Sequence, residues 1–103
     1  MPTITVLYPR QDGATFDFDY YARTHLPLVE ARWKGNGLTG VEALRGVAVD
    51  GGEPPFLAIA LISFDTMESL GAAVNGPHMA EIGADIANFT NVRPVRQVSE
   101  AIR

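Results

Sequence analysis

Apolar and polar residues follow one another along four stretches of the chain in the manner of β-strands. The clearest stretch is an apolar run near the middle, and the first stretch is rich in β-branched residues and ends at Pro9. Gly40 and Gly46 interrupt another stretch, where they predict bulges or a bend. The expected strands are residues 3–8, 38–49, 56–64 and 91–102.

The segment after the first strand has the apolar spacing of a helix, and we expect Asp17 to cap its N-terminus. The apolar face of this helix consists of Phe18, Tyr21, Ala22, His25, Leu28, Val29 and Trp33. Pro27 has no N–H to donate to the Arg23 carbonyl, and its ring pushes that carbonyl away. We therefore expect a kink or a restart near His25, and we expect the Gly-Asn-Gly sequence at residues 35–37 to end the helix.

A second helical segment follows the third strand. Asp65 and Glu68 have the spacing of a capping box, and the Asn-Gly-Pro sequence at residues 75–77 breaks the helix, which restarts at Pro77. Its apolar positions are Met67, Leu70, Val74, Met79, Ile82 and Ile86. The resulting order of strand, helix, strand, strand, helix, strand is that of the α+β ferredoxin-like fold, with both helices on one face of a four-stranded antiparallel sheet. We expect residues 1–103 to form one such domain.

The third strand also predicts self-association, because residues 56–62 contain no polar side chain. A sheet with helices on only one face normally alternates apolar and polar residues, whereas both faces of this strand require cover. A second copy of the same sheet would supply that cover, so we expect a face-to-face homodimer with closed symmetry. The alternative is a monomer in which the outer face of a central strand is mildly apolar.

Composition narrows the classes of function. The net charge is −4 and the 8 Lys and Arg residues are scattered, which argues against a nucleic-acid partner. There is no cysteine, which excludes disulfides and thiolate chemistry, and no apolar run approaches the roughly 18–20 residues that cross a bilayer. The N-terminus lacks the features of a signal peptide, so we expect a cytoplasmic protein. No GxGxxG, Walker or GxSxG pattern occurs, and we expect no nucleotide cofactor.

The two histidines are the candidates for proton transfer. His25 lies on the apolar face of the first helix, where a half-dry cleft would suit it to general acid or base catalysis. The alternative is a core histidine that is bonded to a carbonyl freed at the kink. We expect His78 in the first turn of the restarted second helix, at a pocket rim or on the surface, and neutral because of the helix dipole. No third histidine or carboxylate stands at ligand spacing, so we expect no metal site.

Aromatic side chains supply much of the expected core, and some of them are expected to line an apolar cavity between the sheet and the helices. The candidate substrate-binding residues are Tyr21, Trp33, Phe56, Phe64, His78 and Phe89. Arg45, Arg93 and Arg96 would suit an anionic ligand, although a solvated strand face also accounts for them.

Residues 16–29 combine an aromatic-rich helix start with the motif His25-x-Pro27-Leu28 and resemble the hallmark of the EthD family. Residues 88–94 resemble the family's closing stretch before the last strand, so the resemblance spans essentially the whole chain. It implies a dimeric α+β barrel and maps the family's histidine onto His25, which favours a functional role there. The family takes its name from a protein linked to breakdown of ethyl tert-butyl ether, and many members are labelled reductases. Relatives on the same barrel include a muconolactone methyl-isomerase, polyketide cyclases and cofactor-free monooxygenases.

The leading hypothesis is a small catabolic enzyme, of oxidoreductase or isomerase class, that acts on a hydrophobic, oxygen-bearing organic molecule. His25 would transfer a proton in a pocket lined by Tyr21 and other aromatic residues, without a metal, nucleotide or other cofactor. One alternative is a non-catalytic protein that binds a small apolar ligand. Another is a haem-binding barrel with His25 or His78 as the axial ligand.

Overall fold

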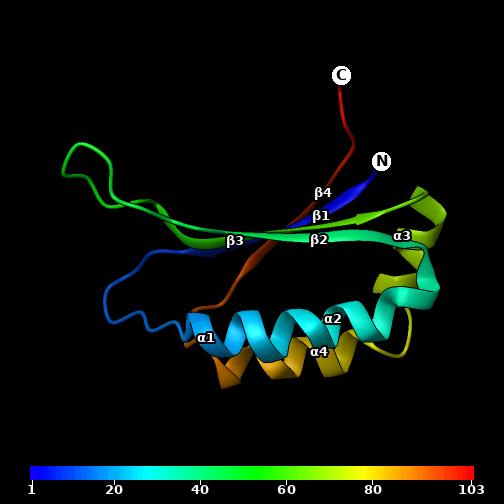
Figure 1. The fold of residues 1–103 in the computed structure, drawn as a ribbon, viewed down its shortest axis with the longest axis horizontal. Coiled ribbons are helices and arrows are strands. Elements are labelled where there is room, and N and C mark those ends of the chain that lie inside the picture. Colours follow the sequence, from blue (N-terminus) through cyan, green and yellow to red (C-terminus); the bar gives the residue numbers. More distant parts are fainter.

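The computed structural model, which describes residues 1–103, contains one antiparallel sheet with the strand order β2-β3-β1-β4 (Figure 1). Its strands are β1 (Thr3–Pro9), β2 (Leu38–Arg45), β3 (Phe56–Phe64) and β4 (Val95–Ser99). Its helices are α1 (Phe18–Tyr20), the π-helical η1 (Tyr21–His25), α2 (Leu26–Trp33), the 3-10 helix η2 (Lys34–Asn36), α3 (Met67–Val74), α4 (Met79–Asp85) and the 3-10 helix η3 (Ile86–Asn88). The predicted α+β ferredoxin-like fold is confirmed.

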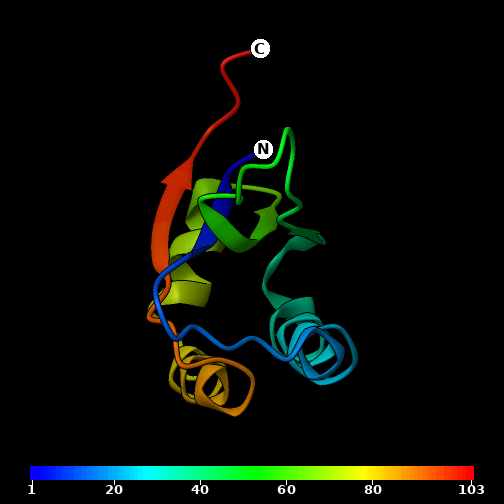
Figure 2. The same cartoon turned by 90° about the vertical axis from the view of Figure 1, so that its left-hand side faces the viewer.

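The helices cover one face of the sheet only. In Figure 2 the helix formed by α1, η1 and α2 lies side by side with α4 beneath the sheet. Side chains alternate along each central strand, so that Ile4, Val6 and Tyr8 of β1 are buried against the helices while their neighbours point to the opposite face. An ion pair between Arg32 Nε and Glu81 Oε1, 2.7 Å apart, joins α2 to α4 at the surface.

The opposite face of the sheet also carries apolar residues, as the absence of polar side chains from residues 56–62 of the third strand predicted. Ile59 of β3 pairs with Leu44 on one side and Leu7 on the other, and Leu7 pairs in turn with Val95. Four aliphatic side chains therefore form a continuous row across all four strands, which we call the outer row. Leu44 is 49% exposed and Val95 is 57% exposed, because no helix of this chain covers them.

Two strands are shorter than predicted. β2 ends at Arg45 rather than residue 49, and the following residues form a loop. Gly46 lies so close to Pro54 and the carbonyl of Phe56 that a side chain would not fit there. β4 spans only Val95–Ser99 of the predicted residues 91–102. Its pairing with β1 stops at Thr3, where β1 begins. The expected irregularity at Gly40 is confirmed, because the register between β2 and β3 shifts there.

The helix ends agree with the sequence in part. The Asp17 carboxylate accepts a hydrogen bond of 3.0 Å from the Tyr20 backbone N–H, as expected of the predicted cap. The second helix was predicted to begin with a capping box of Asp65 and Glu68, and this prediction was wrong. Thr66 is the capping residue, and its hydroxyl accepts from the Ser69 N–H at 3.0 Å. No helix of the chain has the length and apolar character that spanning a membrane requires.

Candidate functional site

His25 is positioned by a π-helical turn, after which α2 starts at Leu26, near the kink or restart that the sequence predicted. The Leu26 N–H reaches the carbonyl of Tyr21, five residues back, and Pro27 follows as an early residue of α2. Because Pro27 has no N–H, the normal α-helical hydrogen bond to the Arg23 carbonyl cannot form. Residues spaced four apart in an α-helix are rotated by about 40° relative to each other around the helix axis. The wider π turn reduces this rotation for residues on either side of it. Tyr21, His25, Val29 and Trp33 consequently all lie buried on the inner face. Such turns often occur at functional sites.

His25 forms a hydrogen-bonded pair with Asp85, which is 60 residues away in the chain. Nδ1 of His25 lies 2.9 Å from Oδ2 of Asp85, and the side chains are 6% and 12% exposed. The Tyr21 ring stacks beside the imidazole and the Phe89 ring packs against it at 4.6 Å between centroids. Asp85 was not among the candidates drawn from the sequence. In the sequence, Asp85 is distinguished only as a carboxylate at the end of an apolar helix, shortly before residues 88–94, which resemble the family's closing stretch.

The Asp85 carboxylate is held ionised by three donors. Burial raises its pKa, but hydrogen bonds from Tyr20 Oη, Asn88 Nδ2 and His25 outweigh burial and bring the pKa below its ordinary value. An ionised carboxylate only accepts hydrogen bonds, so Nδ1 of His25 must carry the proton. When the imidazole carries only this proton, Nε2 has the electron pair that a general base needs.

We expect the Asp85 carboxylate to stabilise the fold in a pH-dependent way. Its pKa in the folded chain is lower than the ordinary value of 3.8, so its contribution is complete well above that pH and is lost as the pH falls through the folded-state pKa. The difference in free energy of unfolding between wild type and Asp85→Asn should therefore shrink between about pH 6 and about pH 3 in urea denaturation. The exposed Asp12, replaced by Asn, is the matched control. A difference that does not vary with pH would contradict this account.

His25 lines an apolar cavity between the sheet and the helices. The cavity has a volume of about 40 Å³, roughly the space of three water molecules. Most of its wall is hydrophobic, and its lining residues are Ile4, Val6, Tyr8, Tyr21, His25, Leu26, Val29, Trp33, Ala60, Ile62, Met79, Ile82, Gly83, Ile86 and Arg96. Arg96 of the edge strand β4 is exposed, and its guanidinium contacts the sulfur of Met79 at 3.5 Å. The only cationic side chain that lines the cavity, Arg96, therefore lies at its edge rather than within it.

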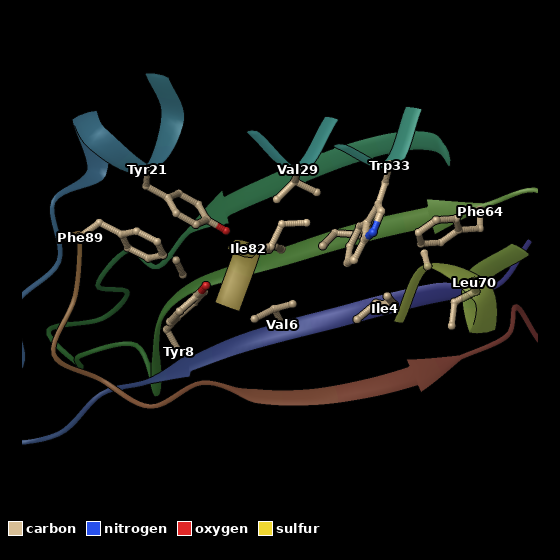
Figure 3. Close-up of a cluster of buried hydrophobic side chains, with 14 residues drawn as sticks. Ile4, Val6, Tyr8, Tyr21, Val29, Trp33, Phe64, Leu70, Ile82 and Phe89 are labelled. Carbon is tan, nitrogen blue, oxygen red and sulfur yellow. The ribbon is translucent and has the colours of Figure 1, made fainter. Parts of the chain in front are cut away.

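Two buried tyrosines extend into this space. The hydroxyls of Tyr8 and Tyr21 point toward each other between the sheet and η1, close to Ile82 (Figure 3). The side chains are 1% and 4% exposed, and neither hydroxyl forms a hydrogen bond within the chain. Burial raises the pKa of Tyr21 to about 12, and burial together with the neighbouring Tyr21 raises the pKa of Tyr8 further. Both hydroxyls thus remain protonated at any physiological pH.

The structure brings some of the sequence candidates together and separates others. Tyr21, Trp33 and His25 line the cavity, and Phe89 lies directly behind His25. The remaining candidates Phe56, Phe64 and His78 are not part of its wall, and Phe64 packs against Trp33. Tyr8 lines the cavity but was not among the candidates, because its strand position alone predicts only a core residue.

Trp33 is buried against Phe64, with its ring centroid 5.8 Å away in an edge-to-face arrangement. Its indole N–H has no hydrogen-bond partner, and Figure 3 shows the nitrogen on the side of the ring that faces Phe64.

The cavity does not suit the haem alternative. A volume of about 40 Å³ is far too small for a macrocycle. His78 lies outside the cavity wall. The chain also contains no group of three or more His, Cys, Asp or Glu side chains that is arranged to hold a metal ion.

Comparison with known proteins agrees with this architecture. Residues 9–93 match the family described as the EthD domain. The chain is similar to an EthD-like protein from Ralstonia eutropha JMP134, with 36% sequence identity, a TM-score of 0.88 and coverage of 99% of this chain and 92% of that one. The match includes the segment that contains His25 and Asp85.

More distant structures share the fold alone. A dimeric ferredoxin-like protein of unknown function from Jannaschia sp. CCS1 has 15% identity and a TM-score of 0.68, with coverage of 97% of this chain and 98% of that one. SnoaB, a cofactor-independent oxygenase from Streptomyces nogalater, has 8% identity and a TM-score of 0.68, with coverage of 99% and 93%. The fold therefore occurs in a dimer and in an enzyme that works without a cofactor.

Proposed function

Because the chain belongs to the EthD family, we propose that it is a small enzyme that transfers a proton to or from a hydrophobic, oxygen-bearing organic molecule. The observation that carries the proposal is the pairing of His25 with Asp85 at an apolar cavity. A histidine that served only the core would not need an ionised carboxylate supported by two further donors, Tyr20 and Asn88.

In the proposed reaction Nε2 of His25 accepts a proton from the bound molecule. Asp85 holds the imidazole in the required tautomer and stabilises the imidazolium that forms. The apolar wall excludes water, which strengthens each of these interactions. The same imidazolium can then return its proton to another atom of the substrate. Isomerisation, cyclisation and cofactor-free oxidation all begin with such a step, and the last of these is supported by the fold that the chain shares with a cofactor-independent oxygenase.

We also propose that the protein works as a homodimer in which the outer rows of two sheets face each other. The row of Leu44, Ile59, Leu7 and Val95 is an aliphatic surface without cover in the single chain. A surface of this kind favours an isologous contact, because the same residues then cover each other about a two-fold axis. A protein of the same fold is described as dimeric, which supports a dimer but not a particular interface.

Proton exchange at carbon tests the proposed chemistry directly. Cyclohexanone is a small apolar ketone, and loss of its α-proton signal in D2O can be followed by proton NMR. We expect the wild type to accelerate the exchange and His25→Gln to reduce that acceleration by at least about a hundredfold, since a general base contributes about 10²–10⁴. His78→Gln changes the other histidine outside the cavity and serves as the control. Equal exchange by the two variants would contradict the proposal.

A further inference from the structure

The hydroxyls of Tyr8 and Tyr21 have no hydrogen-bond partner within the chain. Each lies on a ring that is at least nine-tenths buried, and neither donates to any acceptor in the chain. Neither hydroxyl oxygen is among the side-chain atoms fully buried without a partner, so both reach the accessible space of the cavity. A phenylalanine at either position would fill the same space without presenting a polar group to it. Two such groups that point into one cavity indicate that an acceptor atom of a ligand is their partner.

The remaining polar groups of the cavity restrict what this ligand can be. His25 offers an acceptor at Nε2, the two tyrosines offer donors, and the cation of Arg96 stands at the outer edge. A ligand that is anionic from the start would enter an apolar space without a buried countercharge, which is unfavourable. A neutral molecule with an oxygen acceptor and a removable proton close to it satisfies all three groups.

We propose that Tyr8 and Tyr21 bind the oxygen of a neutral enolisable ketone or a phenol while His25 accepts its proton. The inference rests on the proposed function of His25. For a ketone, the C–H bond next to the carbonyl breaks and its proton moves to Nε2. The electron pair of that bond forms a C=C bond, and the C=O electron pair moves onto the oxygen, which becomes an enolate. The two hydroxyls donate to this oxygen as its charge develops, in the way that an oxyanion hole acts. Return of the proton from the imidazolium to a carbon of the enolate completes the cycle, without any other reactant.

The arrangement of the side chains agrees with this assignment. The rings of Tyr8 and Tyr21 lie 5.9 Å apart in an edge-to-face contact, and the Tyr21 ring stacks on His25 at 5.6 Å. The three groups thus form a continuous cluster that crosses from β1 to η1. A ligand oxygen between the hydroxyls would lie in the cavity that His25 also lines, so the ligand and the imidazole share one enclosed space.

Two matched probes test the oxygen site. In 4-fluorophenol and 4-fluorotoluene a hydroxyl replaces a methyl group, and fluorine NMR titration gives a dissociation constant for each. The phenol resembles an enol, so we expect wild type to bind it at least about tenfold more tightly than the toluene. In the double variant Tyr8→Phe, Tyr21→Phe we expect this preference to fall below about threefold. Thermal denaturation checks the fold, and the midpoint should be unchanged or higher because no hydrogen bond within the chain is lost. Equal affinity for both probes in wild type, or binding of neither, would overturn the inference.

The cyclohexanone assay separates this inference from the proposed function. We expect each single variant, Tyr8→Phe and Tyr21→Phe, to reduce exchange by about 10–1,000-fold, as removal of one donor does in other oxyanion sites. If His25→Gln abolishes exchange and both tyrosine variants retain it, the proton transfer stands and the tyrosine pair is excluded. If the phenol preference depends on the tyrosines and exchange does not depend on His25, the oxygen site stands and His25 is excluded as the base.

Discussion

Replacing Trp33 with alanine is expected to lower the free energy of unfolding by about 3–5 kcal/mol, a large part of the stability of a domain of this size. Trp33 is the only tryptophan of the chain and is 2% exposed. It fills the space between α2 and the Phe64 end of β3, where it makes the edge-to-face contact described above. Its removal leaves a large cavity in a core that cannot collapse onto it, because the sheet and the helix are both held by other contacts.

Urea denaturation followed by circular dichroism at one fixed protein concentration measures this loss, since a dimer links stability to concentration. Met67→Ala is the control, because it also truncates a large apolar side chain but at a position that is 42% exposed. We expect this control to change the free energy of unfolding by less than about 1 kcal/mol. A loss of similar size in the two variants would show that Trp33 does not fill the core as described.

Replacing Ile59 with glutamate is expected to convert the proposed dimer into monomers. Ile59 lies at the centre of the outer row, between Leu44 and Leu7. In a single chain the new carboxylate would face water, so the fold should remain. In a symmetric dimer two such carboxylates would be buried near the two-fold axis, which is strongly unfavourable for unpaired charges. We therefore expect the dissociation constant of the dimer to rise by at least about a thousandfold, since a buried unpaired charge costs several kcal/mol.

Sedimentation velocity at micromolar concentration gives the oligomeric state of both proteins. Ala31→Glu introduces the same charge on the exposed surface of α2 and is expected to leave the dimer intact. A wild-type protein that sediments as a folded monomer would contradict the proposed dimer. A dimer that survives Ile59→Glu would place the contact elsewhere on the chain.

Much of the architecture follows from local sequence patterns. The apolar run that forms β3 has the predicted bounds, because both faces of a central strand are apolar here and no turn residue interrupts it. Asp17 was recognisable as a cap because its side chain acts on the adjacent turn. The ends of β2 and β4 were not predictable in the same way. They depend on where the neighbouring strand and the loop at Gly46 lie, which only the folded chain determines.

The residues of the candidate site were likewise predictable only in part. His25 was found because a histidine on an apolar helical face is unusual, and Pro27 marked the irregular turn that holds it. The sequence predicted a kink or a restart there, and α2 does start at Leu26, but the π-helical form of the preceding turn was not predicted. Asp85 and Tyr8 reach the site from distant parts of the chain, and no spacing within one segment connects them to His25.

The bond between His25 and Asp85 joins the two helices that enclose the cavity, and the ion pair of Arg32 with Glu81 joins them a second time. A guest larger than a few atoms must push these helices apart to enter. A separation wide enough to break the bond between His25 and Asp85 would leave the base without the partner that fixes its tautomer. The two links between the helices thus set how far the cavity can widen before the base loses its partner.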